Sequence, residues 1–158
     1  MRPIRPEDEP MLVKFHYTLS DRTVYLRYLR PMLLEKRVAH ERLSRICHCD
    51  YNREINFLAE IDAEEPSERH ILGAIRLSKM HGLNEARFSI LVSDPVHGRG
   101  LGKEMMRRLV DIARQEKLSH IEALITPDNE VMKHICGELG FTFVPVAEEN
   151  LVKARIDL

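Results

Sequence analysis

The stretch "DPVHGRGLGKEMM", residues 94–106, places glycines at Gly98, Gly100 and Gly102, although the whole chain of 158 residues has only seven. It follows the apolar run "ARFSILVS" (residues 86–93) and leads into a segment whose apolar residues recur at helical spacing. Glycine is favoured where the backbone turns with a positive φ or approaches a ligand closely. The pattern predicts a strand, a glycine-rich turn and a helix whose first N–H groups can bind an anion such as phosphate. A turn that only connects the strand to the helix is the alternative, and these residues alone leave both open.

Two common phosphate-binding motifs do not fit this stretch. The P-loop requires Ser or Thr after its Gly-Lys pair, but Lys103 is followed by Glu104. The dinucleotide fingerprint requires G-x-G-x-x-G, whereas the spacing here is G-x-G-x-G. An anion bound at a helix N-terminus is the form of phosphate binding that survives both comparisons.

The composition limits the classes of protein to which the chain can belong. With 44% hydrophobic and 31% charged residues, we expect one soluble globular domain over residues 1–158. A net charge of −1 gives no basic field for nucleic acid, and no apolar run approaches the roughly 18 residues that span a bilayer. The N-terminus "MRPIRPEDEP" lacks the apolar stretch of a signal peptide. We therefore predict a cytoplasmic protein without a nucleic-acid or membrane partner.

The three cysteines, Cys47, Cys49 and Cys136, are an odd number for a disulfide framework, so we expect reduced thiols. The "CHC" motif at residues 47–49 has no second ligand cluster at a spacing typical of zinc sites. We therefore predict no metal site, and we expect small buried thiols near a helix end.

Hydrophobic periodicity predicts helices alternating with strands. We expect helices from Asp8, over residues 21–29, over about 37–47, after Gly102, and over 127–141 with Asp128 or Asn129 as the N-cap and Gly140 as the stop. Strands are expected near residues 2–8 and over 54–61, 70–78, 86–93, 120–126 and 151–158. The order indicates a mixed α/β (α+β) architecture around a largely antiparallel sheet.

Two motifs resemble the GNAT superfamily of N-acetyltransferases. In "HGRGLGK", Gly100 and Gly102 match the acyl-CoA pyrophosphate loop, while His97 stands where the family usually has Gln or Arg. Asn129 followed after ten residues by "GF" (Gly140 and Phe141) is similar to the family's fourth helix and next strand.

The resemblance extends nearly end to end to the GNAT domain of bacterial protein lysine acetyltransferases, through "RPIRPEDEP", "DYNREI" and "ILVSDPVHGRGLG". In those proteins a large acyl-CoA-synthetase-like region usually accompanies the domain. The chain is therefore either a stand-alone relative or a piece of a longer protein.

The resemblance implies the GNAT fold, in which a mixed, mostly antiparallel sheet is flanked by helices and two splayed strands form the acyl-CoA site. It implies that the backbone of Leu91, Val92 and Ser93 pairs with pantetheine, and that a strand N–H near Leu91 stabilises the oxyanion. The pyrophosphate loop would comprise His97, Gly98, Arg99, Gly100, Leu101, Gly102 and Lys103, with Arg99 and Lys103 adding charge. Asn129 would either bind pantetheine or cap its helix.

The implied reaction moves an acetyl group from acetyl-CoA to a primary amine, on a protein lysine or a small molecule, by direct attack in a ternary complex. A lysine amine with a pKa of about 10.4 must first lose a proton. In the lysine acetyltransferase group a Glu before the strand's first aromatic residue accepts that proton; here the position is Arg87, which cannot act as a base. Glu85, about 7 Å away on the same side of the strand, is the nearest substitute, and His81 is a more distant one.

Arg87 also supports two other readings. The chain can be a catalytically weak or inactive acyl-CoA-binding module with a regulatory role, or Arg87 can select an acceptor that carries a carboxylate. Cys136 aligns with the tyrosine that many members use as a general acid, and we expect it and Tyr51 to be structural. The acyl-group preference is open, as is assembly into a homodimer.

Overall fold

Seven strands form one mixed sheet in the order β1-β2-β3-β4-β5-β7-β6 in the computed structural model, which describes residues 1–158. β4 and β5 run parallel, and every other neighbouring pair is antiparallel. The predicted mixed, mostly antiparallel sheet is confirmed. The strands are β1 (Arg2–Pro3), β2 (Glu54–Glu60), β3 (Ile71–Lys79), β4 (Glu85–Val92), β5 (His120–Ile125), β6 (Thr142–Val146) and β7 (Leu151–Asp157).

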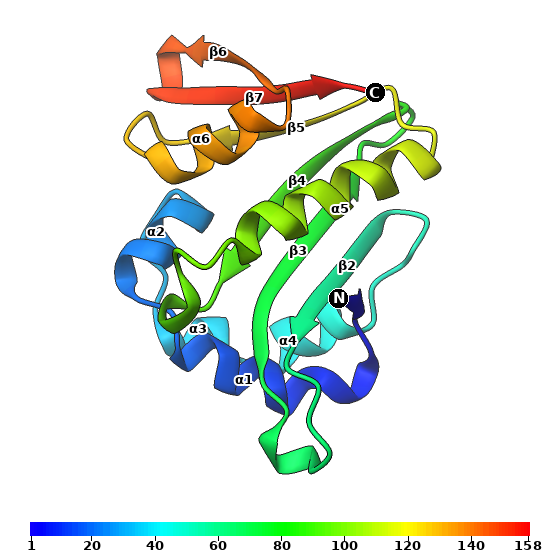
Figure 1. The fold of residues 1–158 in the computed structure, drawn as a ribbon, viewed down its shortest axis with the longest axis vertical. Coiled ribbons are helices and arrows are strands. Elements are labelled where there is room, and N and C mark those ends of the chain that lie inside the picture. Colours follow the sequence, from blue (N-terminus) through cyan, green and yellow to red (C-terminus); the bar gives the residue numbers. More distant parts are fainter.

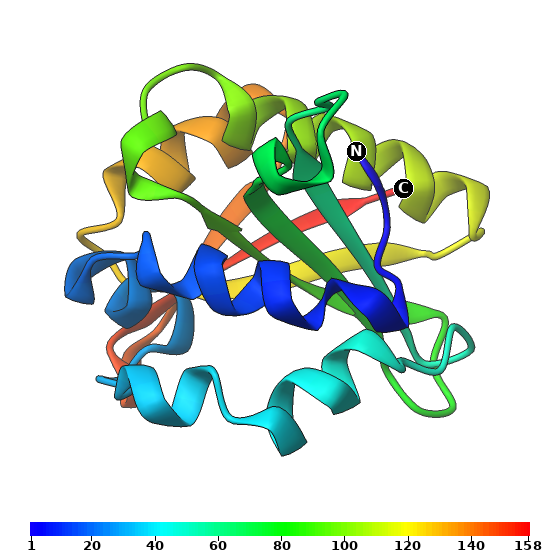
Figure 2. The same ribbon diagram turned by 90° about the horizontal axis from the view of Figure 1, so that it is seen from below.

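Helices cover both faces of the sheet (Figures 1 and 2). One face carries α1 (Glu9–Tyr17), α2 (Asp21–Tyr28), α3 (Leu34–Arg37) and α4 (His40–Cys47). The opposite face carries α5 (Leu101–Gln115) and α6 (Glu130–Glu138). No helix is both long and apolar enough to cross a bilayer.

Each face of the sheet has its own hydrophobic core. Under α5, the side chains of Met105, Met106 and Leu109 are fully buried, as the helical spacing of these apolar residues requires. On the other face, Phe15 of α1 and Leu43 of α4 pack in a second cluster that includes residues of the sheet. The sheet is therefore covered on both sides, and its central strands are held rigidly against the helices.

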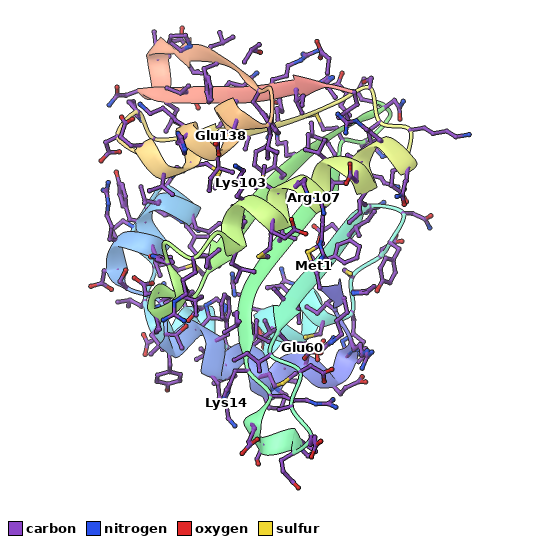
Figure 3. All side chains as sticks on the ribbon, viewed as in Figure 1. Met1, Lys14, Glu60, Lys103, Arg107 and Glu138 are labelled. Atoms are coloured by element: carbon purple, nitrogen blue, oxygen red, sulfur yellow. The ribbon has the colours of Figure 1, made fainter.

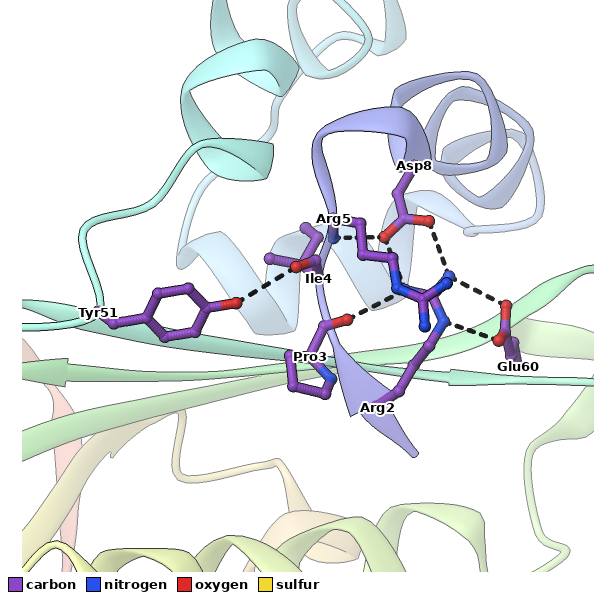
Figure 4. Close-up of polar contacts among 7 residues, drawn as sticks. All are labelled: Arg2, Pro3, Ile4, Arg5, Asp8, Tyr51 and Glu60. Atoms are coloured by element: carbon purple, nitrogen blue, oxygen red, sulfur yellow. Dashed lines mark hydrogen bonds and ion pairs between the residues drawn. The ribbon is translucent and has the colours of Figure 1, made fainter.

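An ionic network ties the first strand to the sheet. The Arg2 guanidinium contacts Asp8 and Glu60, each at 2.7 Å (Figure 4). Asp8 is buried and also accepts the Arg5 N–H. The hydrogen bond from Arg2 lowers the pKa of Glu60. Tyr51 donates to the Ile4 carbonyl at 3.4 Å in the same region, a contact that agrees with the expected structural role.

The elements differ from the sequence predictions at three places. β6 was not predicted, because Pro145 interrupts a short exposed run; on the sheet edge a proline costs no ladder hydrogen bond. The helix expected over about 37–47 is α4, which begins only at His40 because Ala39 has a non-helical ψ of 132°; the short α3 before it was not predicted. The last helix spans only Glu130–Glu138, with Asn129 as its N-cap.

Candidate active site: the cleft between β4 and β5

β4 and β5 pair over a short length only. Their parallel ladder has three residue pairs and ends with Arg87 opposite Glu122. Beyond this point, β4 stays with β3 as far as Val92, and β5 stays with β7 as far as Ile125. Because each strand follows its other neighbour, the two diverge into a V, as Figure 1 shows.

The V opens into a cavity of about 1060 Å³, slightly larger than the range of about 300–1,000 Å³ typical of ligand sites. Its walls are β4, β5, the loop before α5, and parts of α2 and α6. Among the predicted binding residues, the lining includes Leu91, Val92, His97, Gly98, Gly100, Leu101, Gly102, Lys103 and Asn129. The structure thus brings most of them together around one cleft; Ser93 and Arg99 are outside the lining.

The register decides which backbone groups of β4 face the cleft. The Ser93 N–H donates to the Leu72 carbonyl, and the Glu85 carbonyl accepts from Met80, both at 2.8 Å. Because these groups alternate in direction along a strand, odd-numbered residues turn their N–H and C=O toward β3. The Leu91 N–H therefore also points toward β3, so among the strand N–H groups near Leu91 those of Ile90 and Val92 face the V.

His97 reinforces this geometry from the start of the loop. Its Nε2 lies 2.8 Å from the Val92 carbonyl oxygen, an even-numbered group that faces away from β3. An imidazole that donates from Nε2 closes the turn between β4 and α5. His97 stands where the family usually has Gln or Arg, and its bond to the Val92 carbonyl gives it a structural role in holding the turn.

The glycine turn presents an unbroken row of backbone donors. Gly98 and Gly100 have φ values of +75° and +83°, which selects glycine at both positions. The N–H groups of residues 98–103 have no acceptor in the chain, and the first helical bond joins the Glu104 N–H to the Gly100 carbonyl at 3.1 Å. Six free donors at the N-terminus of a 15-residue helix are an arrangement that can bind an anion, because the helix dipole adds positive potential there.

Gly102 has a different role in the same turn. Its φ is not positive, and a Cβ there would meet Ile135 Cδ1 at 3.5 Å and Val92 Cγ2 at 3.8 Å, which are ordinary contacts. Gly102 is therefore the position in this turn where alanine fits with little strain.

The basic side chains of Lys103 and Arg107 near the turn already form ion pairs with acidic residues of the chain. Lys103 Nζ lies 2.9 Å from Glu138 Oε2 of α6 (Figure 3), so its charge is already partly balanced. The hydrogen bond from Lys103 lowers the pKa of Glu138. Arg107, on the outer face of α5, instead pairs with Glu104 and Asp111, as a solvated helix residue does.

Asn129 caps α6 and also lines the cleft. Its Oδ1 accepts the Met132 N–H at 3.2 Å and so caps α6. The same side chain lines the cleft. Its Nδ2 makes no hydrogen bond within the chain and can donate to a ligand.

Charged side chains gather at the closed end of the V. Arg87 Nε lies 3.7 Å from Glu122 Oε1; the Arg87 side chain is 65% exposed and that of Glu122 only 9%. Lys153 Nζ is also 3.7 Å from Glu122, so this carboxylate lies between two cations. Sequence reasoning missed Glu122; a lone carboxylate inside the apolar run "HIEALIT" was the available signal.

Neither substitute for the missing base lines the cleft. Glu85 Oε2 is 3.2 Å from His120 Nε2, a separation without hydrogen-bond geometry, and both residues lie in the paired part of the ladder. His81 is exposed in the turn between β3 and β4. Arg87 and Glu122 are likewise outside the lining, although they adjoin its closed end.

The buried cysteines pack in the core. Cys136 is the fully buried residue of α6, and burial raises the pKa of its thiol to about 12. It does not line the cleft, which agrees with the expected packing role. Cys47 is buried at the end of α4, and no three His, Cys, Asp or Glu side chains come together as metal ligands would.

A family model described as "Acetyltransferase (GNAT) domain" matches residues 1–142. The chain belongs to the GNAT acetyltransferase family. It is 26% identical over 141 residues to the protein named "Acetyltransferase PA5475" of Pseudomonas aeruginosa, covering 89% of this chain and 73% of that one. Membership confirms the predicted acyltransferase class, and the family uses acetyl-CoA as a substrate.

Solved GNAT structures have the same fold. The GNAT domain of S. lividans PAT superposes with a TM-score of 0.86 at 24% identity, covering 99% of this chain and 89% of that one. Ribosomal-protein-S5-alanine acetyltransferase from Vibrio fischeri gives 0.76 at 14% identity, covering 99% and 91%. At these identities the likeness establishes the GNAT fold, as predicted, and not the acceptor.

Proposed function

We propose that this GNAT chain transfers an acetyl group from acetyl-CoA to a primary amine by direct attack in a ternary complex. One observation carries the proposal: the open end of the V between β4 and β5 leads to the six free amides of residues 98–103. A long ligand with a diphosphate at one end fits this arrangement.

In the proposed complex, the diphosphate of acetyl-CoA accepts from the amides of residues 98–103, and the cleft-facing groups of Ile90 and the Val92 N–H pair with pantetheine, since the Val92 carbonyl is bonded to His97. Asn129 Nδ2 adds a donor from α6. The exposed side chain of Arg99, which belongs to the turn but not to the cleft lining, contributes positive charge, whereas the contribution of Lys103 is reduced by Glu138.

The thioester would lie toward the closed end of the V, near Phe88 and Ala123, which both line the cleft. The amine nitrogen attacks the carbonyl carbon, a C–N bond forms, and the C–S bond breaks to release coenzyme A as a thiolate. A cleft-facing N–H of β4 stabilises the oxyanion while charge is on the oxygen. Alignment of the two reactants supplies much of the rate enhancement.

The proton of the attacking amine needs an acceptor, which we propose to be Glu85 acting through water. Glu85 lies two residues before Arg87, so its carboxylate is on the same side of β4 as the Arg87 side chain. Glu122 is the second candidate, and its position disfavours it, because the two cations beside it, Arg87 and Lys153, would repel an incoming ammonium group.

A catalytically weak acyl-CoA-binding module is the second candidate function. The specific observation in its favour is Arg87, which stands at the position of the family's catalytic glutamate and is directed to Glu122. Both functions require acetyl-CoA binding, and only the first requires turnover.

Calorimetric titration with acetyl-CoA, followed by a thiol-release assay against a panel of primary amines, separates the two. The proposed function predicts saturable binding and amine-dependent release of thiol. Binding without release for any amine would favour the regulatory module, and the absence of binding would contradict both.

A further inference from the structure

A second cavity, of about 70 Å³, lies on the other face of the sheet, among residues of β2, β3 and β4 and of α1, α2 and α4. Three arginines, Arg27, Arg42 and Arg76, are the charged residues of its lining, and no Asp or Glu is among them. Apolar side chains make up most of the remainder. We refer to this cavity as the arginine pocket.

The positive charge of the arginine pocket is only partly balanced. Arg76 forms an ion pair with Glu54, the one carboxylate that contacts any of the three arginines. Arg42 donates to the Tyr28 hydroxyl at 2.7 Å and to the Arg37 carbonyl at 2.9 Å, both neutral acceptors. Three cations and one carboxylate leave a formal charge of +2 in a half-buried space.

One arginine of the pocket has a buried donor without an acceptor, and a second, which is half-buried, has no polar partner within the chain. The Nε of Arg76 is buried and has no hydrogen-bond partner. The Arg27 guanidinium lies 4.8 Å from the centre of the Tyr28 ring and makes no hydrogen bond or ion pair. Burial, followed by repulsion from the other arginines, lowers the pKa values of Arg27 and Arg76. A buried cationic donor left unsatisfied is costly, so an anion in this pocket would relieve both the charge and the missing bonds.

The neighbouring histidine adds no charge to the pocket. Burial, with a smaller effect from Arg42, Arg37 and Arg27, lowers the pKa of His16 to about 3. His16 is therefore neutral near pH 7, and the pocket's charge comes from the arginines.

The arginine pocket adjoins the acyl-CoA cleft. Arg27, Tyr28, Ser89 and Leu91 line both cavities. Arg76 is the cross-strand partner of Ser89, so its guanidinium belongs to the sheet face on which Ser89 lies. A molecule held by these arginines would therefore lie directly beside β4, which forms one arm of the V.

We infer that the arginine pocket binds the anionic oxyacid group of the acceptor, so that the substrate is a small amine carrying a carboxylate or a phosphate. The planar guanidinium group of arginine can donate two parallel hydrogen bonds, which matches the geometry of a carboxylate or a phosphate. A cavity of about 70 Å³ holds one such group and is too small for a folded protein surface. The assignment of the acceptor as an amine rests on the proposed acetyltransferase function, whereas the binding of an anion in the pocket does not depend on that function.

The first test reads anion binding without turnover. The Arg Nε–H signals of the ¹⁵N-labelled chain are followed during titration with acetate and, separately, with inorganic phosphate at constant ionic strength. We expect saturable shifts of the Arg76 and Arg27 signals with at least one probe. The Arg27→Met variant, which disrupts no ion pair, should weaken binding at least tenfold, and Arg45→Met, an exposed control on α4, should not. Shifts that do not saturate with either probe, or equal affinity in Arg27→Met, would overturn the inference.

The second test compares matched amines in the thiol-release assay: amino acids against their amides, and phosphoethanolamine against ethanolamine. We expect a kcat/KM at least tenfold higher for the anionic member of one series, and loss of that preference in Arg27→Met but not in Arg45→Met. Equal use of neutral and anionic amines by the wild-type chain would overturn the acceptor assignment. If acetyl-CoA does not bind, the proposed function fails, and the anion titration still decides whether the pocket is a binding site.

Discussion

Arg87 and Glu122 face each other across the last paired rung of β4 and β5, with Nε and Oε1 3.7 Å apart. The strands separate immediately beyond them, so the pair marks the closed end of the acyl-CoA cleft. A cation therefore lies at this end of β4, and its partner is a carboxylate on the neighbouring strand.

Arg87→Glu is expected to raise kcat/KM for simple alkyl amines and peptide lysines by about tenfold or more, because it removes a charge that repels ammonium and adds a base. A carboxylate opposite Glu122 would also have a raised pKa, which brings it closer to neutral pH. Thiol-release kinetics of Arg87→Glu and Arg87→Gln give the comparison, since only the first restores a base. No gain over Arg87→Gln would remove position 87 from the mechanism.

Gly100→Val is expected to weaken acetyl-CoA binding at least tenfold, about 1.4 kcal/mol. A β-branched residue resists a φ of +83°, so the turn must change and the amides of residues 98–103 lose their common direction. Gly102→Ala is the matched control in the same turn, because its Cβ fits. Calorimetric titration measures both variants; equal losses in the two would contradict the separate roles given to these glycines.

Glu138→Gln is expected to tighten acetyl-CoA binding by a few-fold at low salt, because it releases Lys103 to interact with phosphate. The gain should shrink as ionic strength rises and screening increases. Glu130→Gln, which removes a carboxylate from an exposed pair with Lys133 on the same helix, serves as the control. If the control tightens binding equally, Lys103 has no specific role.

His16→Gln is expected to flatten the pH dependence of stability in mild acid. The pKa of His16 is lowered to about 3 in the folded chain, against about 6.5 unfolded. Between these values the unfolded state binds the extra proton, so stability falls as pH decreases, with a slope of up to about 1.4 kcal/mol per pH unit. Urea unfolding of the variant and of the exposed control His134→Gln, from pH 7 to pH 4.5, measures it. An unchanged slope in His16→Gln would show that His16 is protonated in the fold.

Local patterns were sufficient to predict the helices, most strands and the glycine turn, because each depends on residues close together in sequence. The turn is the clearest example: φ is positive at Gly98 and Gly100, as the glycines suggested. β6 escaped prediction because Pro145 lowers its strand propensity, and only pairing with β7 makes it a strand.

The parts of the site that depend on register could not be predicted. The family resemblance implied a strand N–H near Leu91 as the oxyanion donor, whereas the N–H groups of β4 that face the V are fixed by its pairing with β3. Glu122 and the arginine pocket were missed for a related reason. Arg27, Arg42 and Arg76 come from three elements, and only the fold brings them together.

Amide chemical shifts of the ¹⁵N-labelled chain during titration with coenzyme A, and separately with pantetheine, test the central claim most directly. The account predicts that coenzyme A strongly shifts the amides of residues 98–103 together with those of Ile90 and Val92, while pantetheine moves only the strand signals. If the amides of residues 98–103 stay unmoved at saturating coenzyme A, the diphosphate does not bind this turn and the proposed site is wrong.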